Sequence, residues 1–231
     1  MARRLLLGLL LLAVLGVAAD FGAARLFESR VTAALERRYD LGSRPVVQVR
    51  DFPFLPHLAT GRLAAVDLAA DDAHAEGITL ASLEAHLRGV RVPRRVLLGG
   101  SGVVRVDRVE GTVELSESQI NLLLADHLRG GSLVIEPNGV RLRVRTEILG
   151  RPVTTLLVGR LAVRNGRIAF IPASVRVGGE GDPALQTRLT SRFTFDVPLP
   201  PLPAGIKVER IDTEAGAVVL TGHAGMLEVA A

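Results

Sequence analysis

The segment from residue 132 to residue 177 constrains the fold most strongly. It contains four runs rich in β-branched and other apolar residues, mostly in alternation with polar ones: "SLVIE", "VRLRVRTEIL", "VTTLLVGRLAV" and "RIAFIPASVRV". Two of the breaks between them contain Asn138-Gly139 and Asn165-Gly166. Asn-Gly between such runs is a strong signal for a tight hairpin turn. The segment therefore predicts an antiparallel meander of long strands.

The same alternation recurs elsewhere in the chain. In residues 78–92, Leu83, Ala85 and Leu87 fall on one face while polar side chains occupy the other, as in a strand with one buried face. We predict further strands at residues 46–51, 61–72, 103–115 and 192–196, and a last hairpin from residues 206–212 and 217–224.

Two segments predict helices. Residues 24–40 place an amphipathic stripe at helical spacing, formed by Phe27, Val31, Ala34, Leu35 and Arg38. The second helix begins at Ser116, with Gln119 three residues later in a capping-box arrangement, and ends at Gly130-Gly131. The predicted fold class is α+β, an extensive antiparallel sheet with two helices.

The N-terminus has the layout of an export signal. "MARR" precedes the apolar run "LLLGLLLLAVLGVAA", which ends in small residues. The run is either a signal peptide cleaved near Val17-Ala18-Ala19 or an uncleaved membrane anchor. In both cases Arg3 and Arg4 place the rest of the chain outside the cytoplasm. We therefore predict that residues 1–23 are a signal peptide or anchor and that residues 24–231 form one domain, in the periplasm or on the outer face of the cytoplasmic membrane.

The composition argues against several classes of partner. The net charge is +4, and Lys207 is the single lysine among 28 basic residues. No basic run is interleaved with aromatic residues, so we predict no nucleic-acid partner, and anionic lipid headgroups fit the charge better. The chain has no cysteine, and its five histidines never stand three or four residues apart, so we predict no metal and no cofactor.

Catalytic signals are weak. "GGSGV" has Val103 where a nucleophile elbow requires glycine. The candidate carboxylates for hydrolysis stand where solvated strand ends or a helix start would carry charge anyway; they are Asp71, Asp72, Glu110, Glu114 and Glu117. We predict that the protein is not an enzyme.

The stretch "DFPFLP", residues 51–56, is unusual in a chain with only 3% aromatic residues. Pro53 and Pro56 cannot donate to a sheet ladder and bias Phe52 and Leu55 toward extended backbone. Three interpretations compete: a plug that closes a core, an apolar lip that contacts lipid, or the wall of an enzyme cleft. We expect a lip at a strand end.

Three motifs in combination carry a family resemblance: "DFPFLPHLATGRL", "GRLAVRNGRI" and "LPPLPAGIKV". With them the sequence resembles the LmeA-like family of bacterial exported phospholipid-binding proteins. The matching positions are Phe52, Pro53, Phe54, Leu55, Gly61 and Arg62 near the start, and Leu199, Pro200, Leu202, Pro203 and Gly205 near the end. The resemblance implies a tubular lipid-binding fold, in which a long curved antiparallel sheet wraps one or two helices and leaves an elongated apolar cavity.

We assign candidate site residues on this basis. The candidate lipid-binding side chains are Phe52, Pro53, Phe54, Leu55, Leu123, Leu124, Leu199 and Leu202. Four basic residues are candidates for the lipid headgroup. Arg62 belongs to the Gly-Arg pair of the motif, and Arg91, Arg94 and Arg95 form a cluster around Pro93, in a loop where phosphate contact is sterically easy. A ladder of Arg141, Arg143 and Arg145 on one sheet face is either a solvated surface or a phosphate contact.

Three functions remain open from the sequence. The first is a non-enzymatic phospholipid binder or lipid carrier of the cell envelope, with an anionic phospholipid and the membrane surface as its expected partners. The second is an envelope hydrolase or glycan-modifying enzyme. The third is a structural accessory subunit of an envelope complex, with protein partners unknown.

Overall fold

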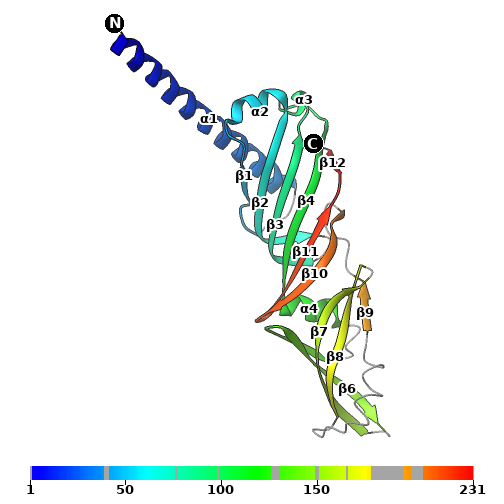
Figure 1. Ribbon diagram of the computed structural model, residues 1–231. Helices are drawn as coiled ribbons and strands as arrows, with labels where there is room; N and C mark the ends of the chain where they lie inside the picture. The colour runs from blue at the N-terminus through cyan, green and yellow to red at the C-terminus, as the bar shows by residue number, and fades with distance from the viewer. Residues whose placement is uncertain are drawn as a thin grey trace. The chain divides into compact units, whose positions relative to one another are not determined.

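The computed structural model describes residues 2–38, 42–75, 78–97, 99–125, 131–148, 151–164, 166–177, 195–198 and 205–230 (Figure 1). The chain divides into two compact units. The first comprises Met1–Asp71, Glu84–Glu110 and Ala224–Ala231, and the second comprises Asp72–Leu83 and Gly111–His223.

Two open sheets make up most of the fold. The larger has the order β1-β2-β3-β4-β11-β10, with β12 also paired to β4, and the smaller has the order β5-β6-β7-β8-β9. Every pair with a described register is antiparallel. The strands of the larger sheet are β1 (Val46–Val49), β2 (Arg62–Ala75), β3 (Ile78–Arg91), β4 (Val103–Ser116), β10 (Lys207–Glu214), β11 (Ala217–Ala224) and β12 (Leu227–Ala230). The α+β class predicted from the sequence is confirmed.

In the first unit, helix α1 (Ala2–Arg38) docks its C-terminal half against β1. Glu28 Oε1 accepts the backbone N–H of Val49 at 2.8 Å, and the buried hydroxyl of Thr32 donates to the carbonyl of Pro45 at 3.4 Å. Of the predicted stripe, Phe27, Val31 and Leu35 are half-buried, whereas Ala34 is exposed and the polar Thr32 is buried instead. The exchange follows from the carbonyl at Pro45, which offers a hydroxyl a partner that an alanine could not use.

The N-terminal half of α1 has the opposite character. Its apolar side chains from Leu10 to Val17 are mostly exposed, by 58 to 70% at Leu10, Leu11, Leu12, Val14 and Leu15. One stretch, beginning at Leu10, is long and apolar enough to cross a membrane, and a signal sequence would have the same character. This half of the helix therefore presents an apolar surface that no described part of the protein covers.

The connection between β1 and β2 contains a helix, whereas Pro53 and Pro56 predicted an extended segment there. Helix α2 (Phe54–Thr60) begins immediately after Pro53, so Leu55 is helical, not extended. Pro56 is tolerated because it stands in the first turn, where a backbone N–H has no partner within the helix. A second short helix, α3 (Arg94–Leu97), follows β3, and both lie at the same end of β2, β3 and β4 in Figure 1.

In the second unit, helix α4 (Glu117–Leu123) starts as predicted. The Ser116 hydroxyl accepts the backbone N–H of Gln119 at 3.4 Å. The helix ends near Leu124, and the predicted stop at Gly130 lies outside the described residues.

Helix α4 also covers the edge of the smaller sheet. The amide of Asn121 exchanges two hydrogen bonds with the backbone of Leu133, at 2.7 and 2.8 Å, and Glu117 Oε2 accepts the N–H of Ile135 at 2.8 Å. Side chains thus occupy backbone groups of edge strand β5 that would otherwise be open to another chain.

The predicted meander is confirmed as strands β5 (Ser132–Glu136), β6 (Gly139–Ile148), β7 (Arg151–Arg164) and β8 (Arg167–Val177), followed by β9 (Phe195–Pro198). Asn138 adopts φ +65° and Gly166 φ +69°, as tight turns require. The last hairpin, β10-β11, is also confirmed, but the sequence reasoning missed β12 after it.

Candidate functional site

The "DFPFLP" motif serves two purposes at once. Phe54 is fully buried, with its ring centroid 5.5 Å from that of Phe27 on α1. Phe52 is 62% exposed, with its ring 5.8 Å from that of Phe21, which is itself 56% exposed. Leu55 is 40% exposed. Phe52 and Leu55 are therefore exposed, as a lip would be, and their contact with lipid stays a prediction. Phe54 is not part of a lip, because it is a plug of the core.

Asp20 holds this motif in place. Its two carboxylate oxygens accept the backbone N–H groups of Phe54 and Leu55, each at 2.7 Å, and the residue is only 5% exposed. Pro53 at the N-cap of α2 makes no side-chain capping bond. A carboxylate supplied by α1 therefore performs the capping that the local sequence lacks. A lone aspartate in an apolar run gave no sequence signal for this role.

The Gly-Arg pair that follows the motif requires glycine at its first position, Gly61, for two structural reasons. Gly61 ends α2 with φ +69°, and its carbonyl accepts the N–H of Val92 at 2.8 Å. A β-carbon at this position would overlap the carbonyl of Val92. The glycine thus permits both a left-handed helix end and a close backbone approach, and it places Arg62 next to the chain that follows β3.

An open hollow of about 420 Å³ lies between the ends of β2, β3 and β4, and we call it the arginine groove. Among the described residues that line it, four carry a guanidinium group and none carries a carboxylate. Its lining residues are Thr60, Gly61, Arg62, Arg91, Val92, Pro93, Arg94, Val103 and Arg105. The structure thus brings together three of the four predicted headgroup residues, which stand up to 32 positions apart in the sequence (94 − 62 = 32).

The arginines of the groove differ in their neighbours. Arg91 pairs with Asp107 at 2.9 Å, and Arg105 pairs with Glu228 at 2.8 Å. Within the described part of the chain, Arg62 and Arg94 form no ion pair and are exposed. Two guanidinium groups therefore remain available to an anion, and their planar forks suit phosphate.

A second, more apolar hollow of about 1100 Å³ adjoins the groove and shares Thr60, Arg62, Arg91 and Arg94 with it. Its other lining residues are Pro56, His57, Leu63, Ala64, Gly89, Val90 and Asp107. Gly89 has φ +65°, and a β-carbon there would overlap the Asp107 carboxylate, so the glycine lets Asp107 approach β3.

The remaining predicted site residues lie elsewhere. Arg95 is exposed in α3, does not line either hollow, and has its side chain against Gly100. Leu123 is half-buried and Leu124 buried, both at the end of α4 in the second unit. Leu199 and Leu202 lie outside the described residues. Sequence reasoning missed three lining residues. Thr60 enters the site as the last residue of α2, and Arg105 and Asp107 enter it because β4 lies beside β3 in the sheet.

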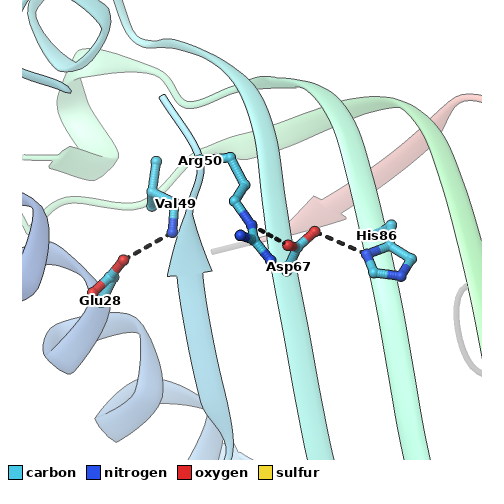
Figure 2. A network of polar contacts seen from close by, with 5 residues as sticks. All are labelled: Glu28, Val49, Arg50, Asp67 and His86. Carbon is cyan, nitrogen blue, oxygen red and sulfur yellow. Dashed lines mark hydrogen bonds and ion pairs between the residues drawn. The ribbon is translucent and has the colours of Figure 1, made fainter. Parts of the chain in front are cut away.

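A polar network crosses β1, β2 and β3 in the first unit (Figure 2). Asp67 on β2 accepts from Arg50 Nε at 2.5 Å and contacts His86 Nδ1 on β3 at 2.8 Å, while Glu28 holds Val49 from the other side. The hydrogen bond from His86 and the neighbouring Arg50 lower the pKa of Asp67 below its ordinary value, although partial burial opposes them. The network ties neighbouring strands together, and both carboxylate oxygens of Asp67 are engaged in it.

Two of the candidate carboxylates for hydrolysis have structural partners. Glu117 bonds to β5 as described, and Glu114 accepts from the Ser82 hydroxyl at 3.2 Å. No cluster of three or more potential metal ligands occurs among the residues that the structure describes.

A comparison with protein families identifies the family of this chain. A family model described as LmeA-like phospholipid-binding matches residues 18–223 of the 231. This chain belongs to the LmeA-like family. The match begins within α1, two residues before Asp20, so it includes both the capping carboxylate and the arginine groove. No curated protein and no solved structure matched the chain.

Membership in the LmeA-like family supports a phospholipid-binding role and agrees with a non-enzymatic protein. The structure also shows what three positions of the family motif do in this chain. Phe54 plugs the core, Gly61 makes the close turn, and Arg62 enters the groove.

Proposed function

We propose that this protein binds an anionic phospholipid without chemically changing it, and that the arginine groove holds the headgroup. The observation that carries the proposal is the convergence of Arg62, Arg91, Arg94 and Arg105 around one hollow in a chain of a phospholipid-binding family. Phosphate accepts charge-assisted hydrogen bonds from guanidinium groups, each worth about 1.5–3 kcal/mol.

The sizes of the two hollows support separate places for the headgroup and for the acyl chains. A volume of about 420 Å³ lies in the range of small-molecule sites and suits a headgroup. The acyl chains require apolar surface, because each buried CH₂ contributes about 0.8 kcal/mol. The larger, adjoining hollow with Leu63, Ala64 and Val90 is one candidate entrance for the chains. We propose that they continue into an elongated apolar cavity that the curved sheet encloses.

We also propose that the protein works as a lipid carrier in the cell envelope, exported by its N-terminal helix. An apolar helix preceded by Arg3 and Arg4 supports export with the sheet domain outside the cytoplasm. We propose residues 1–23 as the signal or anchor and residues 24–231 as the lipid-binding domain, with the contacts of Asp20 and Phe21 joining the two.

The test is a lipid-binding measurement on the full chain in detergent. Native mass spectrometry would compare phosphatidylglycerol with phosphatidylcholine for the wild type and for Arg62→Gln/Arg94→Gln. We expect a phosphatidylglycerol adduct that the double variant weakens about tenfold or more. The matched control is Arg37→Gln/Arg44→Gln, which removes two exposed positive charges from the same unit, outside the groove. Equal losses in both double variants, or no adduct in the wild type, would reject the groove as the headgroup site.

A further inference from the structure

Three apolar side chains stand exposed side by side at the N-terminal end of α2, and we call them the apolar rim: Phe21, Phe52 and Leu55. Phe21 and Phe52 are in ring contact at 5.8 Å, and more than half of each residue is in contact with solvent. The core does not need them, because Phe54 already fills the space beneath α2. Large aromatic side chains kept at the surface by a buried carboxylate clamp require another partner.

The rim continues the exposed apolar surface of α1. The helix runs without interruption from Ala2 to Arg38, and its apolar side chains are exposed from Leu10 through Val17 to Phe21. The twenty residues from Ala2 to Phe21 span about 30 Å, the thickness of the hydrocarbon layer of a bilayer. In a bilayer spanned by this helix, with Arg3 and Arg4 at the far interface, Phe21 would reach the near interface, and its ring contact would hold Phe52 at the same depth.

The groove lies at the other end of the same short helix. Leu55 stands in the first turn of α2, whereas Thr60, Gly61 and Arg62 at its end line the arginine groove. Seven helical residues span about 10 Å, enough to cross the headgroup region of about 5–8 Å on one side of the bilayer. Apolar side chains at one level and unpaired guanidinium groups about 10 Å from them match the layering of an anionic leaflet.

We propose that the α2 end of the first unit docks onto the membrane leaflet from which α1 emerges, with the apolar rim in the acyl boundary and the arginine groove among the headgroups. This inference deepens the proposed function, on which it rests for the role of the groove. It specifies that lipid is taken directly from the leaflet, not from the aqueous phase. Asp20 is the positioning residue of this surface, since it fixes α2 to the membrane-facing helix.

The test uses the absence of cysteine, which allows one label per molecule. The full-length chain with Leu55→Cys carries a solvent-sensitive fluorophore and is reconstituted into vesicles of phosphatidylcholine and phosphatidylglycerol that contain brominated lipid. The matched control is Val46→Cys, an exposed apolar position of the same unit that pairs with Ala69. Ala69 stands seven residues beyond Arg62 along β2, about 23 Å away.

We expect several-fold stronger quenching by brominated lipid at position 55 than at position 46, and a loss of that difference when Phe21 and Phe52 are both changed to serine. Equal quenching at the two positions would overturn the docking proposal. Failure of docking is distinguishable from failure of lipid binding, because native mass spectrometry in detergent reports the adduct without a bilayer. A persistent adduct with no depth difference rejects only the docking, whereas a depth difference without an adduct supports the docking and rejects the headgroup site.

Discussion

The carboxylate of Asp20 on α1 caps the backbone N–H of Phe54, the first residue of α2, at 2.7 Å. The contact joins two segments 34 residues apart and fixes the buried phenylalanine of a motif whose other phenylalanine is exposed. One residue of the N-terminal apolar helix is thus an integral part of the sheet domain. The contact fixes the position of α2, and with it the positions of the apolar rim at one end of this helix and the arginine groove at the other.

Asp20→Ala should destabilise the first unit by about 2–4 kcal/mol, because a buried and a part-buried N–H group lose a charged acceptor. The change in unfolding free energy is measured by chemical unfolding in detergent micelles, followed by the far-ultraviolet circular dichroism of the strands. Glu36→Ala removes an exposed carboxylate from the same helix and should cost less than about 0.5 kcal/mol. Similar losses for the two variants would contradict the capping role.

Phe54→Ala should cost about 3–5 kcal/mol, since it leaves a cavity beneath α2 at a fully buried position. Phe52→Ala, at a position 62% exposed, should cost less than about 1 kcal/mol and should act on membrane docking instead. Unfolding midpoints of the two variants under one condition test the division. A larger loss for Phe52→Ala would show that the exposed ring is the structural one.

Gly61→Ala should destabilise by more than its backbone conformation alone explains. A left-handed φ costs a non-glycine residue about 1 kcal/mol, and the overlap with the Val92 carbonyl adds to that cost. Gly166→Ala is the matched control, because it has the same φ of +69° and open space around it. The difference in unfolding free energy between the two variants isolates the steric overlap, and a difference of zero would contradict it.

Asn121→Ala should cost about 1–3 kcal/mol, because the backbone N–H and carbonyl of Leu133 both lose their partner at the edge of the smaller sheet. The uncovered edge should also promote association between molecules, visible by light scattering during refolding. Leu122→Ala on the same helix, at a position 67% exposed, provides the comparison and should change neither quantity measurably. Normal stability and normal refolding of Asn121→Ala would show that the edge needs no cover.

The network around Asp67 should make the free energy of unfolding depend on pH in the acidic range. Its pKa is lower in the folded protein than in the unfolded chain, so its contribution is complete above about pH 4. The contribution disappears as the pH falls through the folded-state pKa, because the native carboxylate must then be protonated. Asp67→Asn should remove this part of the loss, about 1 kcal/mol or less, because the partners Arg50 and His86 are exposed to solvent. Urea titrations at neutral and acidic pH measure it, and an unchanged acid dependence in the variant would assign the effect to other carboxylates.

Residues close together in the sequence already determined much of the secondary structure of this protein. Alternation and Asn-Gly turns predicted the meander, because side-chain period and turn geometry are properties of neighbouring residues. Ser116 and Gln119 predicted the start of α4 for the same reason. The motif positions also sufficed to suggest the family and three of the arginines that meet at the groove.

Tertiary structure alone decided which phenylalanine is buried. Phe52 and Phe54 are nearly equivalent in sequence, and the difference arises from Asp20 and Phe27, which approach from a helix more than 25 residues earlier. Arg105 and Asp107 join the site because β4 lies beside β3, a long-range pairing that no local pattern encodes. A site of this kind depends on which distant segments share an edge, and only the folded chain brings those segments together.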